Sequence, residues 1–404
     1  MTRRVAVTGM GIVSCLGNRL DDVAAALVAG RSGIRFMPEF AEHGMRSQIA
    51  GVPMTEHLAT PHRRYRRFMG EVAYEAYCAL HAAITDASLD DTLVRHPRTG
   101  LVAGSGTGSL FRHHGELETV RLEGAHKASP FVVPQVMGST VSAVLATAFG
   151  VTGASCSITS ACATASHCLG HAMELIQFGK QDIVLAGGAE ELNWTSALMF
   201  DAMGALSTAY NDRPEAASRP YDQGRDGFII AGGAGMLVLE EMGHARRRGA
   251  RIYGELAGYG ATSDGADMLA PSQDGAARAM NLAMAGLDAH PDYINTHATS
   301  TQAGDLVEVA ALQSVFGAEL PAFSSTKGLT GHPIGAAGAH EAIYTLLMMR
   351  DGFVAGCTNL DHPDPVLHTL PLIRTSIERR IDMAMSNSFG FGGTNASLVF
   401  RRID

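Results

Sequence analysis

The sequence predicts an α/β fold in which a sheet is covered by helices on both faces. Four apolar runs, each bounded by glycine or rich in Val, Ile and Leu, predict buried strands at residues 5–9, 100–104, 182–187 and 235–240. Alanine-rich helical segments lie between such runs, at residues 21–29, 70–87 and 274–287. Because no Pro/Ser-rich linker or run of charges divides the chain, we expect these elements to form one compact unit.

An internal echo suggests two similar halves. Residues 157–187 and 323–356 share one order of elements: a strand, a turn, a helix of small residues, and a second strand that ends in glycine. Two halves of this kind would explain the length of 404 residues without a linker. Since α/β proteins repeat such units in any case, the echo alone leaves duplication and chance equally open.

Composition restricts the class of protein. With 404 residues, of which 46% are hydrophobic and 18% charged, the chain can bury a large core. Its 46 glycines follow no fixed period, which excludes a collagen-like repeat and low-complexity disorder. The net charge of −9 argues against a nucleic-acid-binding protein with a broadly basic face.

The cysteines and the N-terminal segment favour a reducing compartment. The six cysteines contain no C-x-x-C pair, so neither a disulfide framework nor a structural zinc site is expected. A strand is expected from Val5 onward, which leaves no room for a signal peptide, and we therefore expect a cytoplasmic protein. Residues 128–173 contain no Asp, Glu, Lys or Arg, but Pro and Gly interrupt every apolar run. Burial in the fold or at a subunit interface is therefore expected there, and a membrane span is not.

Cys162 is the best candidate nucleophile. It lies where a strand ending near Thr159 meets a helix expected over residues 163–178. A thiol at a helix N-terminus faces unpaired N–H groups, which favour the thiolate and can hold an oxyanion. The alternative is an ordinary buried cysteine. For Cys162 the two interpretations are about equally weighted, whereas for Cys156 and Cys168 the buried core cysteine is favoured.

Two of the 17 histidines are suited to act beside Cys162. His297 follows a strand expected over residues 292–296, and His332 lies in a glycine-lined loop that enters a helix of small residues. Each alone is more often a structural histidine, yet both lie at strand-to-helix turns, where α/β proteins build sites. His167 and His171 follow Cys162 on its own helix and point roughly 140° and 180° away from it.

Four motifs, taken in order, resemble a known family. They are Ser160-Ala161-Cys162, His297-Ala298-Thr299-Ser300-Thr301, Lys327 with His332 and residues 335–338, and the glycine-rich residues 387–395. Together they resemble the β-ketoacyl-acyl-carrier-protein synthases of the thiolase fold over essentially the whole chain. Residues 258–268 are similar to synthase I rather than synthase II. The resemblance implies two duplicated α/β halves in a layered α-β-α-β-α core, with Cys162 in residues 1–250 and both histidines in residues 251–404.

The resemblance implies a decarboxylating Claisen condensation that lengthens fatty acids by two carbons. Cys162 would carry the acyl chain as a thioester, and the backbone N–H groups of Cys162 and Phe391 would hold the oxyanion. His297 and His332 would donate hydrogen bonds to the enolate that forms when malonyl carrier protein loses carbon dioxide. Lys327 would act through its charge and would be held by the carboxylates of Asp305 and Glu308.

Further roles follow from the same resemblance. Thr299 and Thr301 would bind the phosphopantetheine arm of the carrier protein, and Phe391 would gate the two half-reactions. No cofactor is required. A structural monovalent cation would lie among Asn295, Glu341, Ser386 and Asn387.

Two positions depart from the family pattern. Ala298 stands where the family usually has glycine, and it would strain the loop if this position needs a positive φ. Thr107 stands where the most similar synthases have glycine at the far end of the acyl pocket. Its bulk is expected to reduce activity on long acyl primers.

The expected partners are the acyl and malonyl forms of acyl carrier protein and a second copy of this chain. Carrier proteins are acidic, so an enzyme of net negative charge needs a local basic surface. The candidate docking residues are Arg46, Arg63, Arg64, Arg67, Arg121 and Lys127. A solvated helix face is the alternative; the match of Arg63, Arg64 and Arg67 to the family's docking positions favours docking. No nucleic acid and no membrane are expected as partners.

Other functions stay open at this point. A synthase III would carry Asn, and a degradative thiolase Cys, at the place of His332. A non-catalytic chain-length factor would lack the nucleophile, whereas Cys162 is present in an intact Ser-Ala-Cys context. Outside this fold, a cysteine hydrolase uses the same residue types but releases free acid and consumes no malonyl groups.

Overall fold

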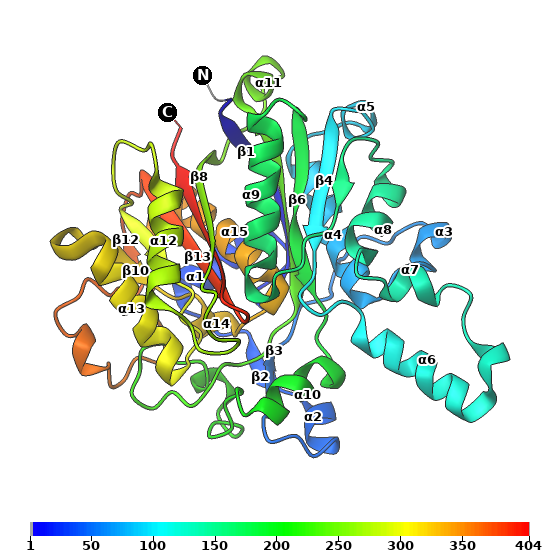
Figure 1. Ribbon diagram of the computed structural model, residues 1–404, viewed down its shortest axis with the longest axis horizontal. Helices are drawn as coiled ribbons and strands as arrows, with labels where there is room; N and C mark the ends of the chain where they lie inside the picture. The colour runs from blue at the N-terminus through cyan, green and yellow to red at the C-terminus, as the bar shows by residue number, and fades with distance from the viewer. Residues whose placement is uncertain (1–2, 404) are drawn as a thin grey trace.

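The protein is built on one mixed sheet that runs through the whole molecule (Figure 1). The computed structural model describes residues 3–403. The strand order is β10-β9-β13-β14-β8-β1-β7-β6-β4-β5. The strands are β1 Val5–Val13, β4 Thr99–Gly104, β5 Ser155–Cys156, β6 Ile183–Glu190, β7 Gly233–Glu241, β8 Gly254–Ser263, β9 Tyr293–Asn295, β10 Ala322–Ser324, β13 Met383–Gly390 and β14 Thr394–Arg401. The four strands predicted from apolar runs correspond to β1, β4, β6 and β7, and are confirmed.

The sheet consists of two halves with the same internal order. In the first half, β4 pairs in parallel with β5 and β6, and β7 is antiparallel to both β6 and β1. In the second half, β9 pairs in parallel with β10 and β13, and β14 is antiparallel to both β13 and β8. The halves meet where Val5–Val7 of β1 pair with Leu256–Gly254 of β8. This repeated pattern confirms the predicted duplication, while the division at residue 250 stays a prediction.

Helices form three layers around and between the two halves. The middle layer consists of α9 (Thr164–Gln177) and α15 (Ala337–Asp351), whose residues share one apolar core with strands of both halves. Glycine permits their close contact, because a Cβ at Gly338 would lie 2.1 Å from Ser166 Oγ. On the outside, α4 (Glu71–Asp86) and α8 (Thr140–Phe149) cover the first half. The second half is covered by α12 and α13, at Gln273–Met284 and Gln302–Phe316.

This arrangement is the predicted α-β-α-β-α layering. The predicted helices at residues 21–29, 70–87 and 274–287 correspond to α1 (Leu20–Ala29), α4 and α12. Among the described residues no helix is long and apolar enough to cross a membrane. Within the uncharged stretch, α9 is largely buried, whereas Ser155 and Cys156 of the edge strand β5 are exposed.

The remaining elements lie outside the layers. Short strand pairs are β2 Ile34–Phe36 with β3 Ile49–Gly51, and β11 Phe353–Val354 with β12 Ile377–Glu378. The other helices are α2 Pro38–Glu42, α3 Arg63–Arg66, α5 Asp91–Val94, α6 Leu110–Glu123, α7 Val132–Val136, α10 Trp194–Met203, α11 Met242–Arg247 and α14 Lys327–Thr330. The described residues also contain six 3₁₀ helices, η1–η6, at Ala125–Lys127, Ala161–Ala163, Pro214–Ala216, Gly317–Glu319, Ile334–Ala336 and Pro365–Leu367. Figure 1 shows α6 projecting from the body of the molecule.

Candidate active site

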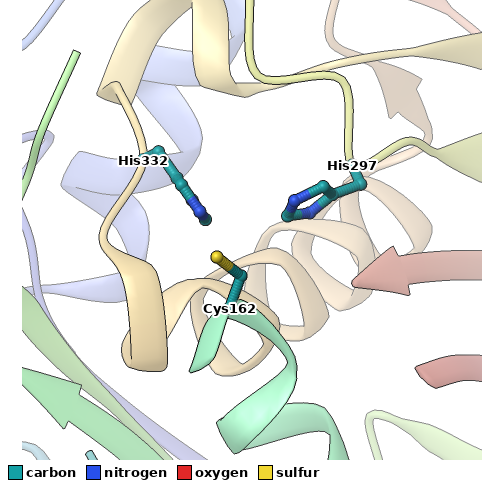
Figure 2. Close-up of side chains that lie close together, drawn as sticks. All are labelled: Cys162, His297 and His332. Atoms are coloured by element: carbon teal, nitrogen blue, oxygen red, sulfur yellow. The ribbon is translucent and has the colours of Figure 1, made fainter. Parts of the chain in front are cut away.

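Cys162, His297 and His332 meet at the centre of the molecule, although 170 residues separate the first and last of them. One ligating atom from each lies within 4.8 Å of the other two. Both imidazole rings point toward the Cys162 sulfur (Figure 2), and the ring centroids are 5.1 Å apart with planes at 85°. Cys162 precedes α9, His297 follows β9, and His332 lies between α14 and η5. Each residue therefore comes from a loop next to a strand or a middle-layer helix.

The Cys162 thiol is held in a tight turn rather than in a regular helix. It lies in the 3₁₀ helix η2, and the α-helix begins only at Thr164, one residue later than predicted. Its residue is 6% exposed, and burial raises the pKa of the Cys162 thiol to about 12. The backbone N–H groups of Phe391 and Cys162 and the charge of Lys327 act in the opposite direction but are outweighed. The N–H groups at this turn therefore lower the pKa of the thiol, as expected for a helix N-terminus, but burial acts against them and has the larger effect.

The two histidines are neutral for the same physical reason. Burial lowers the pKa of His297 and of His332 well below the usual value, and the nearby Lys327 charge lowers both further. A neutral imidazole carries one N–H donor and one acceptor nitrogen. Within the described chain, both ring nitrogens of His332 and Nδ1 of His297 are buried without a hydrogen-bond partner. These rings are thus free to donate to, or accept from, a molecule in the site.

Lys327 is buried beside the site and is paired differently from the expectation. It is 1% exposed, and its Nζ forms an ion pair with Glu341 of α15. The expected partners are engaged elsewhere: Asp305 accepts from the backbone N–H groups of Tyr221 and Thr301, and Glu308 accepts from other residues. Glu341, and not Asp305 or Glu308, is therefore the ion-pair partner of Lys327, although the Lys327 charge still lowers the pKa of Glu308. Middle-layer packing brings α15 to the ammonium group instead.

Glu308 of α13 positions the His297 loop. Its carboxylate accepts from the backbone N–H of His297 at 3.0 Å and of Ala298 at 2.8 Å, and from Asn387 Nδ2 at 3.1 Å. Burial raises the pKa of Glu308 to about 7, and these hydrogen bonds oppose that rise. The glutamate was not predicted to have this role, because no local pattern shows which backbone a buried carboxylate will meet.

Three loops around the site each hold one non-glycine residue with a positive φ. Three of the seven such residues in the described chain lie here: Ala161 (φ 49°) beside Cys162, Ser300 (φ 73°) in the His297 loop, and Ile334 (φ 37°) near His332. Such conformations cost about 1–3 kcal/mol each and persist only where the surroundings impose them. Ala298, for which strain was considered, does not have a positive φ. The positive φ in this loop is at Ser300 instead.

The three residues open into one cavity of about 470 Å³. Thr299, Thr301 and Phe391 contribute to its lining. The ring of Phe391 stacks on that of Phe200, with centroids 6.5 Å apart. Apolar side chains form most of the remaining wall, including Phe200, Phe228, Met268, Leu269 and Ile334. Phe200 was missed by sequence reasoning, because a phenylalanine within α10 carries no motif.

Thr107 lies outside the described lining of this cavity. Its Oγ1 donates to Glu190 at 2.5 Å and its backbone N–H donates to the same carboxylate at 3.0 Å. Glu190 also accepts from Ser105 Oγ, from Gly106 N and from Gly335 N, the last at 2.9 Å. Glu190 therefore ties the loop after β4 to η5, which follows His332. The predicted effect of Thr107 on acyl length stays a prediction.

The candidate docking residues lie on exposed segments. Arg63, Arg64 and Arg67 belong to α3 or its C-terminus, and Lys127 belongs to η1. Two others form ion pairs, Arg46 with Asp201 and Arg121 with Glu118.

The residues considered for a monovalent cation are all buried, but only two have free atoms. Glu341 Oε2 and Ser386 Oγ lack a hydrogen-bond partner among the described residues. Asn387 Oδ1 accepts from Ser397, and the Asn295 amide reaches Thr326 at 3.4 Å. The fit to a cation therefore rests on Glu341 and Ser386.

Comparison with known proteins agrees with this arrangement. A family profile described as "Beta-ketoacyl synthase, N-terminal domain" matches residues 2–245, and the corresponding C-terminal domain matches residues 253–361. The chain is 52% identical to 3-oxoacyl-[acyl-carrier-protein] synthase 1 of Haemophilus influenzae and 51% identical to that of Escherichia coli, with 99% of each chain covered. The chain belongs to the β-ketoacyl synthase family.

Solved structures give the same result at the level of the fold. A β-ketoacyl synthase from Burkholderia phymatum superposes with a TM-score of 0.94 at 39% identity, with both chains fully covered. A ketosynthase of a type II polyketide system, solved with its acyl carrier protein, superposes with a TM-score of 0.88 at 30% identity over both full chains. These structures confirm the predicted thiolase-like fold.

Proposed function

We propose that this protein is a condensing acyltransferase that lengthens acyl chains on acyl carrier protein by two carbons, as a 3-oxoacyl-[acyl-carrier-protein] synthase of type I. The observation that carries the proposal is the convergence of Cys162, His297 and His332, with a backbone N–H of Phe391 directed at the Cys162 sulfur. Relatives that share about half of its residues over their full length carry that name.

The first half-reaction loads the acyl chain. The Cys162 sulfur attacks the thioester carbonyl of acyl carrier protein, and the N–H groups of Cys162 and Phe391 stabilise the oxyanion. As the intermediate collapses, the bond to the pantetheine sulfur breaks and the thiol proton of Cys162 passes to that leaving thiolate. The acyl group remains on Cys162.

The second half-reaction uses both neutral histidines. Malonyl carrier protein loses carbon dioxide, and the electron pair of the broken C–C bond forms an enolate. His297 and His332 each donate an N–H hydrogen bond to the enolate oxygen. The enolate carbon then attacks the acyl thioester, the C–S bond breaks, and the Cys162 thiolate takes up one proton from solvent. The product is a 3-ketoacyl chain on the carrier protein.

Other residues complete the site in this proposal. Lys327 contributes its charge, Thr299 and Thr301 bind the pantetheine amide, and the side chain of Phe391 separates the two half-reactions. Thr107 limits acyl length through its bulk, and its hydroxyl group donates to Glu190. The enzyme needs no cofactor. Glu341 and Ser386, together with Asn295 and Asn387, would hold a monovalent cation, which would supply positive charge to the free Glu341 oxygen.

We also propose the expected partners and location. Acyl carrier protein docks on Arg63, Arg64 and Arg67, supported by Arg46, Arg121 and Lys127. A second copy of the chain covers β5, because this two-residue edge strand exposes Ser155 and Cys156 in an uncharged region. All six cysteines lie in the described residues and are free, which suits the reducing cytoplasm.

The test combines product analysis with labelling of the nucleophile. The full chain is incubated with acyl and malonyl carrier proteins, and the Cys162 peptide is examined by mass spectrometry. We expect a 3-ketoacyl product and acylation of Cys162, both lost in Cys162→Ser and both retained in Cys78→Ser, which replaces a cysteine of α4 outside the site. Acylation elsewhere, or release of free acid without malonyl consumption, would contradict the proposal and favour a hydrolase.

A further inference from the structure

The catalytic cluster also has the composition of a soft-metal site. Within residues 3–403, Cys162, His297 and His332 form the one group of three or more His, Cys, Asp or Glu residues whose ligating atoms all lie within 4.8 Å of one another. A thiolate and two imidazoles are a ligand set that Zn²⁺ accepts, with a fourth position left open. The initial expectation of no structural zinc rested on cysteine spacing and did not consider ligands brought together by the fold.

The geometry needs only small movements to hold an ion. Tetrahedral Zn²⁺ bonded to one sulfur and two nitrogens holds these atoms roughly 3.3–3.6 Å apart. The ligating atoms lie within 4.8 Å of one another and would have to move closer, and the rings already face the sulfur from two sides (Figure 2). Both nitrogens of His332 and Nδ1 of His297 are buried without a protein partner, so no hydrogen bond has to break there.

The surroundings allow a cation to enter and remain. The cavity of about 470 Å³ opens onto the cluster and provides both a route in and space for a water molecule at the fourth position. The positive charge of Lys327 would oppose an ion, but its Nζ is paired with Glu341. Glu308, behind the His297 loop, is a further buried carboxyl close to the cluster. Since Glu341 is already paired with Lys327, Glu308 is the acid that would offset the added charge.

We propose that Cys162, His297 and His332 form a reversible inhibitory site for Zn²⁺ or a similar soft divalent ion. Binding expels the thiol proton of Cys162 and forms one Zn–S and two Zn–N bonds, with no change in oxidation state. The ion binds the thiolate and the unprotonated nitrogen of each imidazole, and the proton of each ring stays on, or moves to, its other nitrogen. A Cys162 whose sulfur already carries a carbon substituent no longer supplies a thiolate and excludes the ion. Metal binding and loading of Cys162 are therefore mutually exclusive.

The test uses Co²⁺ as a spectroscopic probe of the full-length protein after treatment with a chelator. We expect one Co²⁺ per chain, with the visible bands of a tetrahedral site and a thiolate-to-cobalt charge-transfer band, and displacement by Zn²⁺. Cys162→Ser should abolish the charge-transfer band, and His297→Ala or His332→Ala should weaken Zn²⁺ binding by at least about tenfold. Cys78→Ser, which removes a cysteine of α4 outside the site, should change neither. Circular dichroism checks that each variant is folded.

A second measurement on the unmodified protein does not depend on any variant or on carrier protein. Zn²⁺ should protect the Cys162 peptide from alkylation by iodoacetamide, and a chelator should restore its labelling. A spectrum without the charge-transfer band, binding that survives Cys162→Ser, or unprotected labelling of Cys162 would overturn the metal site. Each of these results would leave the proposed condensation untouched, because that activity is measured separately with acyl and malonyl carrier proteins.

Discussion

The two halves of the molecule use the same scaffold but contribute different chemistry. In the first half, the loop after β4 binds the buried carboxylate of Glu190 through Gly106 N and Thr107 N. In the second half, the loop after β9 binds the buried carboxylate of Glu308 through His297 N and Ala298 N. The two loops occupy matching places in the strand order, yet only the second carries an imidazole. The two halves thus share a loop whose backbone N–H groups bind a buried carboxylate, but they differ in the side chains that these loops carry.

The division of labour predicts that the largest loss follows from removing either histidine of the second half. His297→Ala and His332→Ala should each lower the rate of condensation by about 10²–10⁴-fold, because each removes a hydrogen-bond donor to the enolate. Steady-state assays with acyl and malonyl carrier proteins measure this. His171→Ala, at a surface histidine that faces Glu174, is the matched control and should retain activity. If both His297→Ala and His332→Ala retain condensation, the proposed roles of the two histidines are contradicted.

Substitution of Glu308 and of Glu190 compares the two loops that these buried carboxylates hold. Glu308→Gln turns an amide toward backbone N–H donors and should lower condensation by roughly 10–100-fold through misplacement of His297. Acylation of Cys162 by acyl carrier protein should persist. Glu190→Gln should chiefly lower the free energy of unfolding, by about 1–3 kcal/mol, because it disrupts a network that also holds Gly335. Single-turnover assays and thermal melting separate the two effects; equal effects of both variants on condensation would remove the distinction.

Charge reversal tests whether carrier proteins use the basic surface of the first half. Arg63→Glu combined with Arg67→Glu should raise KM for carrier-bound substrates by roughly tenfold, as the acidic carrier is repelled, while kcat changes little. The effect should diminish at high salt. Arg247→Glu is the matched control, because this exposed arginine of α11 pairs only at 3.8 Å with Glu241. An unchanged KM in the double variant would contradict docking at α3.

Relief of strain beside the nucleophile should have a smaller effect. Ala161→Gly removes the Cβ penalty at φ 49° but adds flexibility to the unfolded chain, so the free energy of unfolding should rise by no more than about 1 kcal/mol. Acylation should slow, since the turn that aims Cys162 becomes less rigid. Denaturant titration and acylation kinetics measure the two quantities. If Ala161→Gly instead lowers the free energy of unfolding, the turn is not strained at Ala161.

The smallest effect concerns acyl length. Thr107→Gly should raise turnover on long acyl primers relative to short ones, because it removes bulk that the family lacks at this place. Thr107→Ser separates the methyl group from the hydroxyl group, which donates to Glu190. A series of acyl carrier proteins of increasing chain length provides the measurement. Equal ratios in the variant and the parent would show that Thr107 does not set acyl length.

The sequence was most informative where function depends on a residue type at a loop. Cys162, His297 and His332 stand at strand-to-helix turns, and their motifs were sufficient to single them out. The layered fold was predicted from the resemblance, and the strands β1, β4, β6 and β7 from apolar runs. Such features are local, so they are visible in a few consecutive residues.

Features that depend on packing were not predictable in the same way. Lys327 pairs with Glu341 because α14 and α15 meet in the middle of the molecule, whereas the expected Asp305 and Glu308 bind backbone N–H groups. The helix N-terminus suggested a thiolate, but burial of Cys162 outweighs it and raises the thiol pKa to about 12. Both differences arise from long-range burial, which neighbouring residues in the sequence do not encode.

The measurement that tests the division of labour most directly is release of carbon dioxide from malonyl carrier protein. Cys162→Ala cannot be acylated, yet it keeps both histidines, so it should still release carbon dioxide without forming a condensation product. The His297→Ala and His332→Ala double variant should show the reverse: acylation of Cys162 and no carbon dioxide release above background. If Cys162→Ala releases no carbon dioxide, or the double variant releases it at the parent rate, the assignment of the two half-reactions to the two halves of the molecule is contradicted.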